Sequence, residues 1–330
     1  MSRDSNYTSE WMDSVKCYKC TYLGEYNDKA DDEKQYMLNM LMRYRENCIS
    51  LKRDNVTYSI KVILTANRKK IEIISTSVST IGAMLRIIHE ILRFENLFEG
   101  LFFPLVSFVA DENDYTKKVQ KKQLGYYNSQ KRYLYIPIDM DDRKYKQLYR
   151  KWLKVEKKNK IIHPVFLYSV YLDGMPVDIR MALLLETFEP IAEDLHNRGI
   201  ITLSKSPTKT YSNTCKQCGG RVLRTVPNKE LEFKDKLKPL LKEYGSIIFK
   251  GEKKTKLISK SVKIRNKVDH VRANTENAMN GKQCGFYIYQ FSLMYRYIML
   301  QEIGVMPEEL KPAIIQWLEC FNGQFPQLRI

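Results

Sequence analysis

From about Pro227 onward the chain consists of helix-forming segments, and this limits its last third to a helical fold. Pro307 suits the first turn of the final segment, because that position needs no backbone N–H. Apolar residues recur at helical intervals through segments near Glu230–Phe249, Thr255–Asn274, Gln283–Ile303 and Pro307–Phe321. Helices of these lengths suit a bundle. We therefore predict an all-α domain over residues 226–330.

The segment Leu257–Glu276 combines an apolar stripe with a compact polar group. The stripe falls at intervals of seven, four and three residues and consists of Leu257, Ile264, Val268 and Val271. The polar group outside it consists of Arg265, Asn266, Asp269 and His270. Asn266 and His270 share a helix face, whereas Arg265 lies about 140° round the helix from His270. Only the length of the arginine side chain could bring both groups to one phosphate.

Two interpretations of this polar group remain open. In the first, Arg265 and Asp269 form an ion pair worth a few tenths of a kcal/mol, and His270 is solvated. In the second, Arg265 holds a phosphate and His270 is a general acid or base. Histidine titrates near neutral pH, and guanidinium stabilises the extra negative charge of a five-coordinate phosphoryl transition state.

The order Arg265-Asn-x-x-x-His270 resembles the R-x(4–6)-H signature of the HEPN superfamily (higher eukaryotes and prokaryotes nucleotide-binding domains). The flanking segments Phe233–Phe249 and Gly285–Gly304 resemble the helices before and after this signature in the ApeA-like branch. A weaker likeness extends upstream over Trp152–His196. In its last third the chain therefore resembles an ApeA-type HEPN protein.

That resemblance implies a metal-independent endoribonuclease. The expected reaction is attack of a ribose 2′-hydroxyl on the adjacent phosphorus, which gives a 2′,3′-cyclic phosphate and a free 5′-hydroxyl. This needs a base, an acid and a cation, and one motif supplies only one histidine. A symmetric homodimer would bring two copies of Arg265 and His270 to one composite site. Asn266 would hold His270 or a phosphate oxygen, whereas Asp269 replaces a commonly apolar residue and could pair with Arg265.

The resemblance also implies antiphage defence by abortive infection, in which RNA cleavage halts translation. Transfer RNA is the favoured substrate, because its exposed loops present unpaired nucleotides. The N-terminal part would then be a sensor or restraint that responds to a phage-derived trigger. Two other functions remain open. One is a non-catalytic module that binds nucleic acid or nucleotides, and the other is a zinc-containing scaffold that recruits a partner protein.

Length and charge apply to the chain as a whole. At 330 residues we expect two domains, and the net charge of +17 favours polyanionic partners, although such a charge also serves solubility alone. RNA, DNA and a membrane surface are all polyanionic. No apolar run approaches the ~20 residues needed to span a bilayer. The start, MSRDSNYTSEW, has no hydrophobic segment typical of a signal peptide, so we expect a cytoplasmic protein.

Four of the seven cysteines form two C-x-x-C pairs, Cys17/Cys20 and Cys215/Cys218. Glycines directly after Cys218 are typical of a zinc knuckle, and two such pairs brought together would make a tetrahedral structural zinc site. Reduced thiol pairs and a site shared between subunits are the alternatives. Small core residues in helix-like segments are expected at the other three positions, Cys48, Cys284 and Cys320.

The N-terminal two-thirds alternates strand and helix patterns, so we predict an α+β domain with an antiparallel sheet over residues 1–225. Ser79 or Thr80 would cap its strongest helix. The predicted elements are a helix over Lys34–Arg53, a hairpin of Tyr58–Leu64 with Lys70–Thr76, a helix over Ile81–Phe94, and strands over Leu101–Ala110 and Tyr133–Ile138.

The most basic stretch runs from Lys117 to Lys160. Aromatic residues are interleaved through it, namely Tyr126, Tyr127, Tyr133, Tyr145, Tyr149 and Trp152. Lysines supply phosphate contacts and aromatic faces stack on unpaired bases, which predicts a nucleic-acid surface. The alternative is a solvated helix whose tyrosines pack against the sheet.

Asp178–His196 is predicted to be helical, with Pro190 kinking or dividing it. It resembles the long family helix with a central glutamate, here Glu186 or Glu189. Asn197–Asn213 is the candidate linker. Structural rather than catalytic roles are expected for the remaining histidines, His89, His163 and His196.

Overall fold

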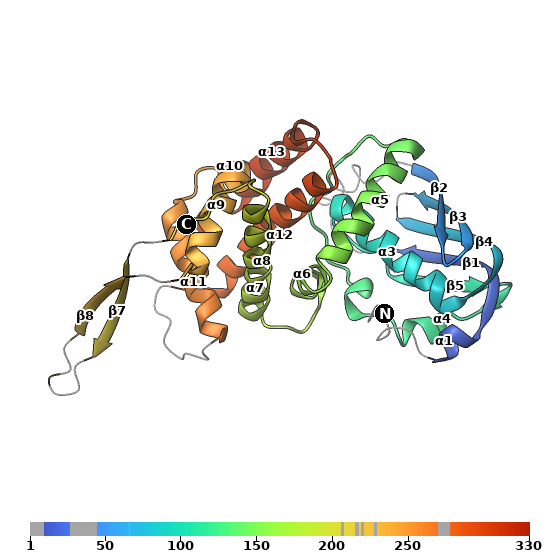
Figure 1. The fold of residues 1–330 in the computed structure, drawn as a ribbon, viewed down its shortest axis with the longest axis horizontal. Coiled ribbons are helices and arrows are strands. Elements are labelled where there is room, and N and C mark those ends of the chain that lie inside the picture. The colour runs from blue at the N-terminus through green and yellow to red at the C-terminus, as the bar shows by residue number, and fades with distance from the viewer. Residues whose placement is uncertain are drawn as a thin grey trace. The chain divides into compact units, whose positions relative to one another are not determined.

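The computed structural model describes residues 10–26, 45–65, 67–205, 208–214, 218, 221–227, 230–269 and 278–330. The chain divides into two compact units, which Figure 1 colours along the sequence. The sheet unit comprises Met1–Met175 and Arg296–Trp317, and the helical unit comprises Pro176–Tyr295 and Leu318–Ile330. The first division therefore falls at residue 175, whereas we placed the domain boundary at residue 225. The architecture is α+β, as predicted.

The sheet unit contains antiparallel strands in the order β2-β3-β4-β1-β5-β6. Their bounds are β1 Lys16–Glu25, β2 Arg45–Arg53, β3 Val56–Leu64, β4 Arg68–Thr80, β5 Leu105–Ala110 and β6 Asn113–Asp114. Pairing of β3 with β4 confirms the predicted hairpin. Alternate side chains of β3, from Tyr58 to Leu64, are buried, which is the period expected of a sheet with one covered face.

Strand β2 shows that the helix predicted over Lys34–Arg53 is wrong for its described part, residues 45–53. Asn47 and Ile49 are buried in alternation, and the remainder of that prediction lies outside the described residues. The turn to β3 holds Asp54 and Asn55 at φ angles of 49° and 64°, which suit a type I′ hairpin. Cys48 consequently lies exposed on a strand and is not a core residue of a helix.

Helix α3 (Ile81–Glu99) packs against β1 and β4, and Figure 1 shows it across the sheet. The Thr80 hydroxyl accepts a hydrogen bond from the Ala83 N–H at 3.1 Å, which confirms the predicted cap. Gly100 ends the helix at φ 70°, and a Cβ there would stand 2.7 Å from the Leu134 carbonyl oxygen. Only glycine therefore fits this turn.

Two predicted strands around α3 are shorter or absent. Leu101–Ala110 is a strand only from Leu105, because Pro104 has no N–H for the ladder. Residues 133–138 form no strand, although their side chains alternate in burial from Leu134 to Ile138. The Tyr133 and Ile136 N–H groups instead donate to the carbonyls of Gly100 and Phe98, at the end of α3.

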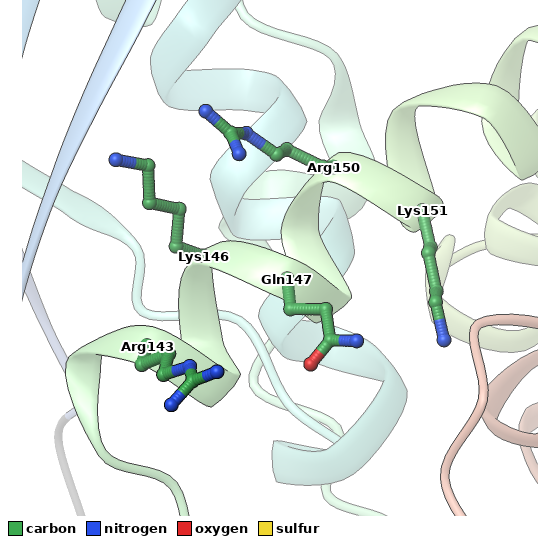
Figure 2. A pocket seen from close by; sticks show the side chains of 5 residues that line it. All are labelled: Arg143, Lys146, Gln147, Arg150 and Lys151. Carbon is green, nitrogen blue, oxygen red and sulfur yellow. The ribbon is translucent and has the colours of Figure 1, made fainter.

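Helix α5 (Asp142–Lys158) packs on α3 and β2. Its inward side chains, together with those of Tyr126, Tyr127 and Tyr133, are buried, so the aromatic residues of the basic stretch do not offer faces to bases. Figure 2 shows the outward face of α5, which carries lysine and arginine. The other described helices of the sheet unit are α1 Glu10–Ser14, α4 Thr116–Gln120, η3 Gly125–Asn128, α6 Ile162–Tyr171, the end of α12 Gly281–Glu302 from Arg296 onward, and the first part of α13 Pro307–Gln324.

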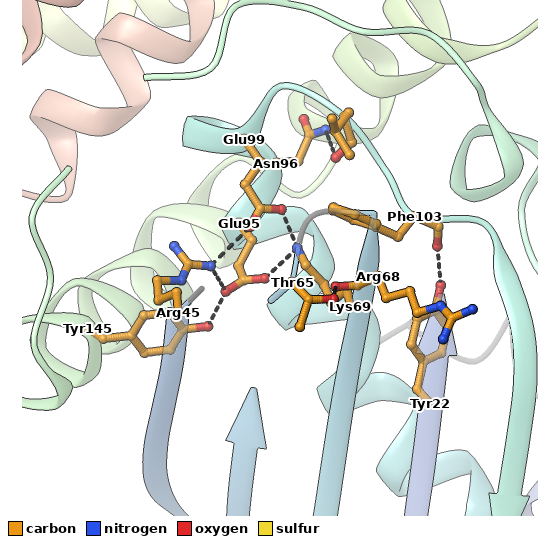
Figure 3. Close-up of polar contacts among 11 residues, drawn as sticks. Tyr22, Arg45, Thr65, Arg68, Lys69, Glu95, Asn96, Glu99, Phe103 and Tyr145 are labelled. Atoms are coloured by element: carbon orange, nitrogen blue, oxygen red, sulfur yellow. Dashed lines mark hydrogen bonds and ion pairs between the residues drawn. The ribbon is translucent and has the colours of Figure 1, made fainter. Parts of the chain in front are cut away.

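A buried ionic cluster lies between α3 and the sheet (Figure 3). The Lys69 ammonium contacts Glu95 Oε2 at 2.5 Å and also Glu99, and Arg45 Nη2 lies 2.5 Å from Glu95 Oε1 and 3.0 Å from Glu99 Oε1. The Tyr145 hydroxyl donates to Glu95 at 2.9 Å. Burial raises the pKa of both carboxyls, but Lys69 and Arg45 outweigh it at Glu95, whose pKa is lowered. The pKa of Glu99 stays raised.

The helical unit contains α7 Val177–Glu186, α8 Phe188–Asn197, α9 Phe233–Glu243, α10 Gly245–Ile248, α11 Lys254–Asp269, α12 Gly281–Glu302 up to Tyr295, and η4 Pro326–Leu328. The predicted helix over Asp178–His196 is divided at Thr187, three residues before Pro190. Strands β7 Thr208–Thr214 and β8 Arg221–Pro227 form a hairpin, so the predicted linker ends earlier than Asn213. Within the described ranges every helix is too short or too polar to cross a bilayer.

Candidate functional site

Helix α11 carries the polar group predicted to be functional, and it packs against α7 and α9. The predicted apolar stripe is confirmed at Leu257 and Ile264, which are both fully buried. Arg265 lies roughly 80–100° round the helix from this stripe, and its side chain reaches the junction of α7 and α8. The α11 stripe therefore determines the direction of the Arg265 side chain.

Arg265 is bound to two glutamates of the helical unit. Its Nη2 lies 3.2 Å from Glu186 Oε2 and 2.9 Å from Glu189 Oε2, and its Nε donates to Glu186 Oε1. Glu186 is the last residue of α7 and Glu189 lies in the first turn of α8, so the break between these helices directs both carboxylates at one guanidinium. The Arg265 side chain is 22 % exposed.

The ring of Phe233, the first residue of α9, covers the guanidinium, with Arg265 Cζ 5.0 Å from the ring centroid. Such a contact contributes about 0.5–1 kcal/mol at partly exposed positions. Together with the two carboxylates, it fixes the plane of the guanidinium.

Lys236 of α9 extends the network. Its ammonium contacts Glu189 and lies 2.6 Å from Glu193. Burial alone would lower the pKa of Lys236, but the hydrogen bonds with Glu189 and Glu193 raise it above its usual value, so the ammonium stays charged. Three carboxylates thus surround two cations, and the group holds an excess of one negative charge.

The other predicted catalytic residues are only partly placed. Asn266 follows Arg265 on α11 and is half-buried. α11 ends at Asp269, whose side chain is not among the described ones, and His270 lies outside the described residues. The predicted approach of Asn266 to His270 and the pairing of Asp269 with Arg265 therefore stay predictions.

A second group of cations lies on α11, on the side away from Arg265 at about 100° per residue. Burial, and then the charges of Lys256 and Lys263, lower the pKa of Lys260. Lys260 also donates to Gln283 of α12 at 3.3 Å. At spacings of four and three residues, Lys256, Lys260 and Lys263 share one face of α11.

The first pair of predicted zinc ligands, Cys17 and Cys20, is buried in the sheet unit. A bulge in β1 between Cys17 and Lys19 turns both Cys17 and Cys20 inward, and Cys17 Sγ lies 3.5 Å from Met84 Sδ. Burial raises the pKa of Cys17 to about 11 and holds the pKa of Cys20 well above its usual value. Among the described residues no group of three potential ligands could hold a metal.

The second cysteine pair lies between β7 and β8. Cys218 is exposed there, and Cys215 lies outside the described residues. A zinc knuckle at this hairpin therefore stays a prediction. Cys284 is buried on α12 as predicted, whereas Cys320 is exposed on α13 and is not a core residue.

The predicted structural roles of the histidines agree with their contacts. His89 stacks on Tyr127 with ring centroids 4.5 Å apart, and His163 is fully buried against Trp152. His196 Nδ1 lies 3.2 Å from the Ile201 carbonyl oxygen, beside the end of α8. None of these contacts forms a catalytic group.

Comparison with known families bears directly on α11. Residues 202–309 match the model of the Apea-like HEPN family. Over these residues the chain is similar to an Apea-like HEPN domain. The match spans 108 of the 330 residues and includes Arg265, Asn266 and His270. No curated protein and no solved structure matches the chain.

The HEPN assignment confirms the resemblance drawn from the signature and its flanking helices. Such a domain indicates a nuclease or a nucleotide-binding module. Glu186 and Glu189 were both candidates for the central glutamate, and both contact Arg265. Sequence reasoning missed Lys236 and Glu193. The spacing of Glu186, Glu189 and Glu193, three and four residues apart, was a usable signal, because it places three acids on one helical face.

Proposed function

We propose that the HEPN domain is a metal-independent endoribonuclease that cleaves RNA, with transfer RNA the favoured substrate. The observation that supports this most directly is the fixed guanidinium of Arg265 within the HEPN match. A cation held in one orientation needs no rearrangement when negative charge develops on a phosphate. Glu186, Glu189 and Phe233 supply that orientation.

The reaction requires two proton transfers at one phosphate. The 2′-oxygen attacks phosphorus and loses its proton to one imidazole, while the bond to the 5′-oxygen breaks and a second imidazole gives that oxygen a proton. His270 supplies one imidazole, so we propose that a second copy of the chain supplies the other. The products are a 2′,3′-cyclic phosphate and a 5′-hydroxyl. Arg265 stabilises the phosphorane, and Asn266 holds His270 or a phosphate oxygen.

The biological setting we propose is antiphage defence by abortive infection. The sheet unit would restrain the HEPN domain until a phage-derived trigger arrives. Support for this setting comes from the similarity to the Apea-like HEPN family. The sheet unit is a separate compact unit, and most of it lies outside residues 202–309.

Cleavage of purified transfer RNA in EDTA tests the chemistry. Wild-type protein is expected to yield cyclic-phosphate ends, and Arg265→Ala and His270→Ala are expected to yield none. Arg198→Ala and His196→Ala are matched controls, because they remove the same residue types from the same unit. Cleavage that survives His270→Ala, or that appears only with a divalent metal, would overturn the proposal.

The composite site has its own test. Asn266→Cys is expected to form an intermolecular disulfide on mild oxidation, because the two signature helices would face each other. The exposed thiols Cys48, Cys218 and Cys320 are first replaced by serine. A monomer by light scattering, with no disulfide, would contradict the dimer.

A second candidate function is a non-catalytic module that grips nucleic acid. It is favoured by the two carboxylates on Arg265, because a phosphate must compete with them for the guanidinium. Tight RNA binding without cleavage in any condition, lost in Arg265→Ala, would select this alternative.

A further inference from the structure

The outward face of α5 in the sheet unit is a concentrated source of positive charge. The helix contains eight basic and two acidic residues. Arg143, Lys146 and Arg150 fall within about 60° of its surface and along about 10 Å of its length, at 100° and 1.5 Å per residue. Figure 2 shows these side chains extending from one stretch of the helix, with Gln147 beside them.

The charge of this face is not neutralised within the described part of the chain. Both acids of α5 are engaged on its other sides. Asp142 Oδ1 accepts from the Cys48 N–H of β2 at 2.9 Å, and Glu156 pairs with Arg93 of α3. Arg143, Lys146 and Arg150 have no ion-pair partner among the described residues. Three like charges held together in this way attract polyanions.

The face is also rigidly mounted. The opposite side of α5 is buried through Tyr145, Leu148, Tyr149 and Trp152. The Tyr145 hydroxyl reaches Glu95 in the buried ionic cluster, and the Asp141 carboxylate caps the helix by accepting from the Lys144 N–H at 2.7 Å. The basic side chains therefore project from a fixed backbone, which reduces the entropy lost on binding.

A hollow of about 420 Å³ lies along this face, lined by Arg143, Lys146, Gln147, Arg150 and Lys151. Its lining contains no apolar side chain, unlike typical sites for small organic ligands. It also contains no carboxylate, unlike a cation site. Phosphate groups suit such a lining, with up to one phosphate for each of Arg143, Lys146 and Arg150.

We propose that the α5 face docks the phosphate backbone of RNA without reading its sequence. The six aromatic residues named in the sequence analysis of the basic stretch are buried, so none of these described rings is available for stacking on bases. Binding must therefore be electrostatic and strongly dependent on salt. This inference rests on the proposed function only in taking RNA as the ligand, and it does not require that RNA be cut.

The salt dependence of binding tests the inference. A labelled single-stranded RNA of mixed sequence is titrated with full-length His270→Ala protein, so that the probe stays intact. Each phosphate contact contributes about 0.7 to the slope of log affinity against log salt, so Arg143→Gln/Lys146→Gln/Arg150→Gln should lower the slope by about 2. From about 50 to 200 mM salt, His270→Ala protein should then lose about 18-fold more affinity than the triple variant in the same background.

A matched control removes the same charge from elsewhere in the sheet unit. Lys52→Gln/Lys117→Gln/Lys121→Gln replaces three exposed lysines outside α5 and should leave the slope unchanged. An equal drop in both triple variants would show a general charge effect and overturn the inference, as would an unchanged slope in the α5 variant. Affinity that varies strongly between RNA sequences of one length would also overturn it.

Failure of the two proposals is distinguishable. A protein that never cuts RNA but shows the α5 slope change refutes only the nuclease. A nuclease whose α5 variant binds RNA with the original slope refutes only the docking surface.

Discussion

Replacing Lys69 with methionine is expected to destabilise the sheet unit strongly and in a pH-dependent way. Lys69 shares the inward phase of β4 with Ile71 and Ile73, and its ammonium is buried between Glu95 and Glu99. Methionine keeps the length of the side chain but removes the charge. Two buried carboxylates would then share only Arg45.

The loss of unfolding free energy in Lys69→Met is set by whichever costs less, an unpaired buried carboxylate or the protonation of one carboxylate. Removing one partner of a buried ion pair costs about 3–5 kcal/mol. Glu99, whose pKa is already raised, can instead take up a proton on folding. For a carboxyl of ordinary pKa about 4.3 in the unfolded chain, this costs about 3.7 kcal/mol at pH 7 and about 1 kcal/mol at pH 5. The deficit of Lys69→Met should therefore shrink as the pH falls.

Tryptophan fluorescence during urea unfolding measures this deficit. All three tryptophans, Trp11, Trp152 and Trp317, lie in the sheet unit, so their signal reports on that unit. Adding Glu99→Gln to Lys69→Met removes the need for a proton, so it should restore most of the stability at pH 7 and flatten the pH dependence.

Lys70→Met is the matched control for this experiment. Lys70 lies next in β4, half exposed, with Glu72 at 2.8 Å. An exposed pair of this kind contributes about 0–1 kcal/mol, so this variant should change little. The reasoning is refuted if Lys69→Met costs no more than Lys70→Met at pH 7, or if its deficit is the same at pH 5.

Three further predictions concern other parts of the molecule. Burial, and then Arg93, hold the pKa of His163 well below 6.5, so only the unfolded chain takes up this proton and the protein loses stability as the pH decreases. Between pH 7 and pH 5, wild type should lose about 2 kcal/mol of unfolding free energy relative to His163→Phe, and parallel curves of stability against pH would contradict this. Glu186→Gln with Glu189→Gln should reduce RNA cleavage about 10-fold, the scale for groups that orient a functional side chain, and faster cleavage would show that they restrain Arg265 instead. Cys17→Ala and Cys20→Ala should leave the zinc content unchanged by metal analysis, and loss of zinc in either would restore them as ligands.

The spacing of apolar residues was sufficient to predict a helix or strand where that element buries one face only. The alternation in β3 and the stripe of α3 predicted both elements and the Thr80 cap. It failed at β2, because the helical pattern that starts at Lys34 was continued to Arg53. The residues Asp54 and Asn55, which are typical of a hairpin turn, were a signal that a strand precedes them. The buried ionic cluster was also missed, although Lys69 falls in the apolar phase of its strand and Glu95 and Glu99 in the stripe of α3.

The candidate site was predictable only along α11. The signature identified Arg265, because the motif is local in sequence. Its partners depend on the break between α7 and α8, which directs Glu186 and Glu189 at one guanidinium, and no spacing within α11 encodes that contact. The basic stretch predicted charge correctly, but whether its aromatic rings face bases or the core is decided by packing on α3 and β2.

Strand β1 has a consequence for how the protein is made. It precedes the other described strands, yet its neighbours are β4 and β5, with Lys16 opposite Thr80 and Cys20 opposite Ala110. During synthesis the backbone N–H and C=O groups of β1 have neither β4 nor β5 to pair with until the intervening chain has been translated, which takes on the order of 10 s. A cut that removed β1 would split the finished sheet in two instead of trimming its rim, so affinity tags belong ahead of Glu10 and shortened versions should not start within β1.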